Sequence, residues 1–192
     1  MLGTEIQSHD TTAPAEGDLE VLQRFVNLHQ HAPGTSHEIP ASTEMFRTFL
    51  LERGLLEAEE RFGDPERETA AALSEAMHAR VRANMGEPMS AAHVDRIDRV
   101  AQAAGLHPHF QPDGPVLVPQ AGGVKGAFGR LVAIAFHAEL DGRWEHLKEC
   151  ADDDCHAVFF DRSKNHSGRW CSMQSCGNRN KVRAWRERQK AP

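Results

Sequence analysis

Apolar residues recur every three or four positions through much of the first 140 residues, the spacing that lines one face of an α-helix. Ser42 or Thr43 can cap the second such segment, and Pro65 is favoured in the first turn of the third. Ser90 can cap the fourth, which Gly105 can end in a left-handed conformation. The pattern therefore predicts helices at about 18–31, 43–54, 64–85, 90–105 and 124–140.

Two short extended segments interrupt this helical pattern. Residues 107–111 (HPHFQ) and 115–120 (PVLVPQ) flank a Pro-Asp-Gly turn and so predict a small β-hairpin, whose prolines indicate strands at a sheet edge. After it, residues 124–140 are apolar nearly all round, which is typical of a buried central helix that Gly142 then ends. The fold class expected is mainly α with a small β element.

A chain of 192 residues with 40% hydrophobic and 26% charged residues fits one ordinary globular domain with a small appendage. Residues 1–16 are polar and lack periodicity, so we expect a flexible N-terminus outside the fold. No apolar stretch reaches the roughly 18 to 20 residues of a membrane span, and the N-terminus lacks the features of a signal peptide. We therefore expect a cytoplasmic protein without a membrane partner, with a helical domain at 17–144 and a smaller module at 145–192.

Charge is unevenly distributed along the chain. The formal net charge is -6, which taken alone argues against a nucleic-acid partner. Residues 1–160 hold 13 Lys and Arg against 26 Asp and Glu, whereas residues 161–192 hold nine against two. The basic C-terminal segment therefore indicates a nucleic-acid-binding surface, although such a segment can also dock on the acidic body or stay solvated.

All four cysteines lie near the C-terminus, in the pattern Cys150-x4-Cys155-x15-Cys171-x4-Cys176. Two close pairs separated by a short loop can surround one ion with four sulfurs, the tetrahedral arrangement that Zn²⁺ favours. Free structural thiols or a redox pair are the alternatives in a reducing compartment. We predict one structural zinc ion per chain, held by the four cysteines, with His156 and His166 as competing ligands.

The residues around the cysteines predict a small zinc-dependent module. Residues 158–160 and 169–170 flank the turn-forming KNHSG and predict a second hairpin, and the segment after Cys176 is helical. The order of knuckle, hairpin, knuckle and helix is that of a treble-clef-like zinc finger with four cysteine ligands. With so few apolar residues, this finger should need its metal to fold. We expect it to dock on the helical domain through three side chains, those of Leu147, Trp170 and Trp185.

Several of these residues resemble a known family. The resemblance to the CGNR zinc finger is carried by Phe160 to Asn165, Arg169 to Met173, Cys176 to Arg179, and Lys181. In bacterial proteins of this type an N-terminal ABATE domain precedes the finger, and Phe25-Val26-Asn27 and residues 49–56 (FLLERGLL) are similar to the opening of that domain. The resemblance implies a zinc-binding, DNA-binding transcription regulator linked to stress, with a sensing or regulatory helical domain.

A helix beginning near residue 178 would carry its side chains in two stripes. Arg179, Arg183, Arg186 and Lys190 form a cationic stripe, beside which lie Asn178, Val182, Trp185 and Gln189. We expect the second stripe to pack on the protein and the first to remain free for phosphates or guanine. Arg179 can equally serve the fold by pairing with Asp161 or by capping carbonyl groups. The full set expected to bind nucleic acid is Arg162, Lys164, Arg169, Arg179, Lys181, Arg183, Arg186, Arg188 and Lys190.

The function expected is therefore that of a zinc-binding regulator that contacts DNA through its finger, with RNA the less favoured nucleic acid. One finger offers few contacts, so a homodimer would improve specificity. A small-molecule effector of the helical domain would lie near Phe25, Asn27 and Phe49, although aromatic residues at helical spacing usually pack in a core. The alternative is a zinc-stabilised module that binds a protein or RNA, joined to a small-molecule-binding helical domain.

An enzyme is not expected from this sequence. The pairs His29/His31 and His107/His109, with many carboxylates, could in principle form a second metal or acid-base site, but nothing in the sequence fixes their geometry. No nucleophile motif is present, and a zinc ion with four thiolates has no open position for water.

Overall fold

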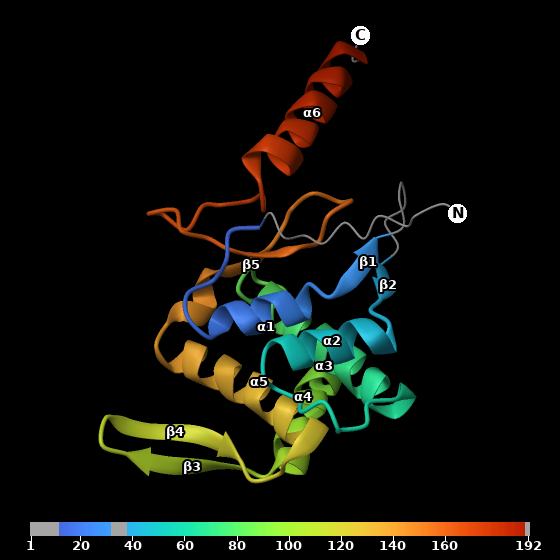
Figure 1. Ribbon diagram of the computed structural model, residues 1–192. Coiled ribbons are helices and arrows are strands. Elements are labelled where there is room, and N and C mark those ends of the chain that lie inside the picture. Colours follow the sequence, from blue (N-terminus) through green and yellow to red (C-terminus); the bar gives the residue numbers. More distant parts are fainter. Residues whose placement is uncertain (1–11, 32–37, 191–192) are drawn as a thin grey trace.

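The computed structural model describes residues 12–31 and 38–190, and within them the chain is mainly helical, as predicted (Figure 1). The helices are α1 (Leu19–Val26), α2 (Thr43–Glu52), α3 (Asp64–Ala83), α4 (Ala91–Ala104), α5 (Gly123–Leu140) and α6 (Asn178–Lys190). The strands are β1 (His29–His31), β2 (Glu38–Pro40), β3 (Leu106–Gln111), β4 (Gly114–Pro119), β5 (Leu147–Glu149) and β6 (Val158–Phe160). They pair in chain order as three two-stranded antiparallel sheets.

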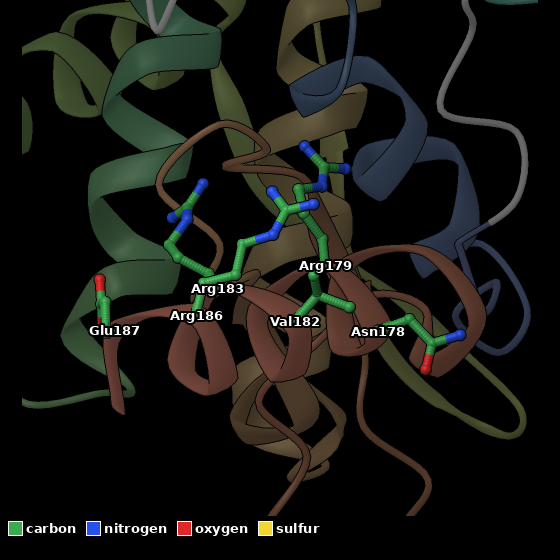
Figure 2. Close-up of a pocket in the computed structure, with 6 residues that line it drawn as sticks. All are labelled: Asn178, Arg179, Val182, Arg183, Arg186 and Glu187. Carbon is green, nitrogen blue, oxygen red and sulfur yellow. The ribbon is translucent and has the colours of Figure 1, made fainter. Parts of the chain in front are cut away.

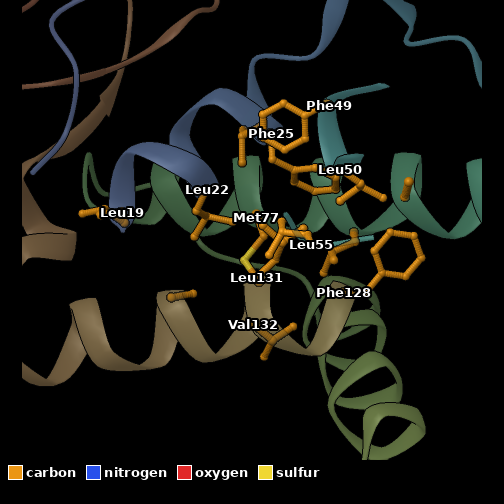
Figure 3. Close-up of a cluster of buried hydrophobic side chains, with 14 of the residues drawn as sticks. Leu19, Leu22, Phe25, Phe49, Leu50, Leu55, Met77, Phe128, Leu131 and Val132 are labelled. Atoms are coloured by element: carbon orange, nitrogen blue, oxygen red, sulfur yellow. The ribbon is translucent and has the colours of Figure 1, made fainter. Parts of the chain in front are cut away.

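Helices α1 to α5 form one body, with α6 projecting from one end of the molecule and the β3–β4 hairpin extending at the other (Figure 1). The core lies where α1, α2, α3 and α5 meet (Figure 3). Leu22, Phe25, Met77 and Leu131 are completely or almost completely buried there. The buried central helix predicted at 124–140 is confirmed as α5. No helix in the described part of the chain is long and apolar enough to cross a membrane.

Several helix boundaries follow the signals in the sequence. The Ser42 and Ser90 side chains accept hydrogen bonds from backbone N–H groups in the first turns of α2 and α4, and Gly105 ends α4 at a φ of 61°. The first helix, predicted to reach residue 31, instead ends at Val26. Asn27 is the C-cap residue of this helix, and its side chain binds the backbone of Val158 in the distant strand β6.

The β3–β4 hairpin has the predicted Pro-Asp turn, and its prolines protect its edges. A proline nitrogen cannot donate to the strand ladder, so Pro108, Pro115 and Pro119 occupy positions where an amide would point outward. On β4 the outward N–H of Leu117 donates to Nε2 of His137 on α5 at 2.9 Å. The hairpin therefore offers few free amides to a third strand.

The second predicted hairpin is wrong in its pairing. Strand β6 pairs with β5, so that Leu147 lies opposite Phe160, and residues 169–170 form no strand. Burial selects this pairing because Leu147, Val158 and Phe160 all belong to the core of the helical body. The β5–β6 ribbon is therefore part of that core, although the sequence placed the boundary of the helical domain at residue 144.

The N-terminal segment is also more ordered than predicted where the structure describes it. Oε1 of Gln23 accepts the N–H of Ala15 at 2.6 Å, and its Nε2 donates to the carbonyl of Ala13 at 3.0 Å. The N–H of Phe160 donates to the same carbonyl at 3.3 Å. Residues 13–16 thus lie against α1 and β6, while residues 1–11 of the predicted flexible terminus lie outside the described residues.

Side-chain amides from the helices hold both outer edges of the β5–β6 ribbon. Asn27 donates to the carbonyl of Val158 and accepts the N–H of the same residue, both at 2.8 Å. On the other edge, Nδ2 of Asn84 donates to the carbonyls of Trp144 and Leu147 at 2.8 and 2.9 Å. A three-residue ribbon is too short to be stable alone, so these contacts fix its position.

The Asn27→Ala variant should be destabilised by about 1–3 kcal/mol, because it leaves the N–H of the buried Val158 without its acceptor and leaves the Val158 carbonyl with Nε2 of Gln23 as its side-chain donor. Urea unfolding of the purified protein, followed by circular dichroism, measures this change. The exposed Gln102→Ala on α4 is the control and should change the free energy of unfolding by less than about 0.5 kcal/mol. Equal stability of Asn27→Ala and the parent protein would contradict the role assigned to Asn27.

Candidate metal centre and nucleic-acid interface

The four cysteines come together from three places in the chain. Cys150 and Cys155 lie in the turn between β5 and β6, Cys171 follows the loop after β6, and Cys176 lies in the helical turn Met173–Gly177 just before α6. Their sulfur atoms all lie within 4.8 Å of one another. The Sγ atom of Cys171 is 3.5 Å from that of Cys155 and 3.6 Å from that of Cys176.

This arrangement fits a zinc ion. Four thiolates at about 2.3 Å from a tetrahedral zinc ion keep their sulfurs about 3.8 Å apart, close to the spacings seen here. The N–H of Cys171 donates to Sγ of Cys150 at 3.4 Å, a contact that favours the thiolate. Hydrogen bonds with the Cys150 and Cys155 thiols, together with burial, raise the pKa of Cys171. Ionising all four thiols at such close range is therefore unfavourable unless a cation lies among the sulfurs.

The two histidines considered as competing ligands lie outside this cluster. His156 interacts with Oε1 of Glu149 through Nδ1 at 2.8 Å and with the carbonyl of Asp153 through Nε2 at 3.0 Å. The ring of His166 lies against that of His146, with centroids 4.2 Å apart. Within the described residues, the metal-binding cluster is formed by the cysteines.

Asp161 organises the loop that brings Cys171 to the site. Its buried carboxylate accepts from Nζ of Lys148 at 2.7 Å, from the N–H of Ser163 at 3.0 Å and from the N–H of Gly168 at 2.8 Å. Burial alone would raise the pKa of Asp161, but these donors hold it well below its usual range. A Cβ atom at residue 168 would lie 2.6 Å from Oδ1 of Asp161, so the loop requires glycine there.

A buried carboxylate connects the first cysteine pair to helix α3. Oε2 of Glu149 lies 3.0 Å from Nε2 of His78 and 3.5 Å from Nη1 of Arg82, while its Oε1 meets His156. Burial opposes ionisation of Glu149, yet the hydrogen bonds with the two histidines and the charge of Arg82 lower its pKa to about 2. The residues beside Cys150 and Cys155 are therefore tied to the helical body.

Two arginines predicted to bind nucleic acid are paired within the finger. Nε of Arg179 lies 3.3 Å from Oδ2 of the buried Asp152, and not beside Asp161, which was one of the partners considered for it. Its Nη2 lies 3.7 Å from Sγ of Cys176. Arg183 contacts Asp153 at 3.1 Å and Asp154 at 2.8 Å. The sequence signal for these ion pairs is the run of three aspartates, Asp152 to Asp154, between the first two cysteines. Through these ion pairs the aspartates orient the start of α6.

The stripe of α6 that was predicted to pack on the protein is instead exposed. Val182 is 46% exposed and Trp185 is 54% exposed. The prediction failed because α6 projects away from the helical body (Figure 1). Within the described residues, Trp185 belongs to neither of the two buried apolar clusters. The half-buried positions of α6 are Asn180, Arg183 and Ala184. Of the predicted docking residues, Leu147 is buried in the core and Trp170 packs beside the cysteines.

The cationic side chains of the predicted set differ in their surroundings. A hollow of about 510 Å³ lies along α6 between Asn178, Arg179, Val182, Arg183, Arg186 and Glu187 (Figure 2). Lys181, Arg186 and Arg188 are exposed, and the side chain of Lys190 lies outside the described residues. In the loop after β6, Lys164 is exposed, Arg162 donates to the carbonyl of Pro14 at 2.9 Å, and the Arg169 guanidinium lies 5.1 Å from the Trp170 ring centroid.

The three residues named for an effector have other contacts. Phe25 and Phe49 are core residues, with ring centroids 6.1 Å apart. Asn27 holds the Val158 peptide unit of β6. Of the histidine pairs considered for catalysis, His107 and His109 are exposed on β3, and the side chains of His29 and His31 lie outside the described residues.

Comparison with protein families agrees with this architecture. A model of the ABATE family, described as "Putative stress-induced transcription regulator", matches residues 11–141, and a model of the CGNR zinc finger matches residues 146–189. The chain belongs to the ABATE family. It carries its CGNR zinc finger in the C-terminal position that the sequence predicts. A search of curated proteins found no match.

The purified protein should contain one zinc ion per chain, and Cys171→Ser should lose it, because three thiolates and a hydroxyl hold zinc less well than four thiolates. Elemental analysis after gel filtration measures the content. His166→Asn is the matched control, since it removes an imidazole while keeping a residue that tolerates the positive φ of that position. Zinc retained by Cys171→Ser, or lost from His166→Asn, would contradict the assignment.

Removing the metal with a chelator should make trypsin cut after Arg162, Lys164 and Arg169, because these exposed side chains lie in a loop whose Cys171 end the cluster holds in place. The fragment that ends near residue 162 should persist, since β5 and β6 remain in the core of the body. Mass spectrometry of timed digests with and without chelator identifies the first cuts. Early cleavage in α3 or α5 after chelation would show that the body also depends on the metal.

Proposed function

We propose that this ABATE family member is a DNA-binding transcription regulator whose zinc finger presents helix α6 to duplex DNA. One observation carries the proposal: α6 projects from the body with exposed cations along its length (Figure 1). Lys181, Arg186 and Arg188 are exposed, and exposed Lys and Arg side chains are the groups that neutralise DNA phosphates.

Charge separation supports this orientation of the protein. The chain has a net negative charge, and its first 160 residues hold twice as many acidic as basic residues. Such a body would repel a polyanion, but α6 extends away from it on the far side of the finger (Figure 1). DNA can therefore approach the basic helix without meeting the acidic body.

In this proposal the zinc ion has a structural role. Cys150, Cys155, Cys171 and Cys176 would hold one ion per chain, which would fix the start of α6 relative to the β5–β6 ribbon. Four thiolates complete the coordination sphere of zinc, so the metal would supply folding energy rather than a reactive water. The protein is accordingly proposed to be a binding protein of the cytoplasm and not an enzyme.

The helical domain is well placed to regulate the finger. Asn27 of the body holds β6, and His78 and Arg82 of α3 meet Glu149 beside the first cysteine. An effector that moved α1 or α3 would therefore move the base of the finger. A single finger offers few phosphate contacts, so a homodimer would raise both affinity and specificity.

Affinity for duplex DNA should fall steeply with salt, and Arg186→Ala/Arg188→Ala should reduce the slope of log affinity against log salt by about 1.8, or about 0.9 for each lost phosphate contact. Fluorescence anisotropy with labelled random DNA across a salt series measures the slope. The control is Arg61→Ala/Arg99→Ala, which removes two exposed arginines from the body and should leave the slope unchanged.

A parallel titration with random RNA distinguishes the two nucleic acids, since the proposal requires tighter binding to duplex DNA. Absence of binding to DNA by the zinc-loaded protein at low salt would overturn the proposal. In that case the basic helix would serve a protein partner instead.

A further inference from the structure

Helix α6 exposes two large apolar side chains for which the described part of the protein provides no cover. Val182 and Trp185 are about half exposed, although valine and tryptophan are usually buried in a folded protein. Both lie on the segment that is proposed to meet DNA. Exposed apolar residues gathered beside charged ones often mark a binding surface.

The direction of this apolar pair follows from helix geometry. Successive residues of an α-helix are rotated by about 100°, which places Val182 and Trp185 about 60° apart on one face. The less exposed Asn180 and Ala184 lie on roughly the opposite face. The apolar pair is therefore at the centre of the surface that α6 turns away from the finger.

Cations border this centre on both sides. By the same rotation, Lys181 and Arg188 lie about 70–90° to one side of the midpoint between Val182 and Trp185, and Arg186 and Arg179 lie the same angle to the other side. Lys181, Arg186 and Arg188 are exposed, while Arg179 also contacts Asp152. The outward surface thus consists of an apolar row between two cationic rows.

This pattern matches the major groove of duplex DNA. The groove is about 12 Å wide, admits one α-helix and is bordered on each side by a row of phosphates. Two cationic rows can therefore meet both phosphate rows while the apolar row faces the base edges. A second copy of α6 would fit less well, because its cationic rows would meet those of the first.

We propose that Val182 and Trp185 recognise thymine through its C5-methyl group in the major groove. This inference rests on the proposed DNA-binding function and names the base feature that the helix would read. The thymine methyl is the apolar group that bases present in that groove, and apolar side-chain surface can contact it favourably. The cationic rows would supply affinity without regard to sequence, whereas the apolar row would supply preference.

Replacing thymine by uracil tests this inference directly, because it removes the methyl group and preserves base pairing. The probes are two duplexes of about 20 base pairs between identical G·C clamps, one alternating A and T and the other alternating A and U. Contact with one methyl group is worth roughly a fourfold change in affinity. The zinc-loaded protein should bind the thymine duplex at least several-fold more tightly at the same salt concentration.

Two variants separate the apolar row from the cationic rows. Val182→Ala/Trp185→Ala should bind both duplexes with similar affinity and keep the salt slope of the parent protein. The matched Lys181→Ala/Arg188→Ala should keep the preference for thymine and lose about 1.8 from the salt slope. All four positions are exposed, and circular dichroism with zinc analysis verifies that each variant is folded.

The outcomes distinguish this inference from the proposed function. Salt-dependent binding of the parent protein with equal affinity for the two duplexes would overturn thymine recognition and leave DNA binding intact. A preference that persists in Val182→Ala/Trp185→Ala would assign the methyl contact to other residues and also overturn the inference. Absence of binding to either duplex and to random DNA would overturn both.

Discussion

The side-chain amides that hold the β5–β6 ribbon are the contacts on which the rest of the C-terminal architecture depends. A ribbon of three residues per strand has too few hydrogen bonds to persist alone, so Asn27 and Asn84 determine where it lies. The turn of that ribbon carries Cys150 and Cys155, and these thiols determine where Cys171 and Cys176 must come. The direction of α6 follows from the position of Cys176 immediately before it.

The helices and the cluster of four cysteines could be predicted because both depend on local sequence. Apolar spacing, Ser90 as a cap and Gly105 as a stop determine α4 without reference to any other part of the chain. The spacing of the two cysteine pairs likewise indicates a metal-binding cluster without reference to the rest of the fold. Local signals of this kind are consistent with one another along most of the helical body.

The failures arose where distant contacts decide the structure. Strand β6 can pair with residues on either side in sequence, and only the burial of Leu147 and Val158 in the body selects β5. Amphipathic spacing in α6 predicted that Trp185 would be covered, but spacing cannot tell which face of a projecting helix meets the protein. The acidic residues Asp152 to Asp154 were counted as body charge, although they lie beside the basic helix that they orient.

The bonds between Asn27 and Val158 join residues separated by 131 positions in the chain. At roughly 5–20 residues per second, a ribosome needs on the order of ten seconds to synthesise that interval. During this time, α1 and the Asn27 side chain at its end lack their contacts with strand β6. The N-terminal family domain therefore completes its own edge only after Cys150 and Cys155 have been translated, and a growing chain that stalls before residue 158 would leave the helical body unfinished.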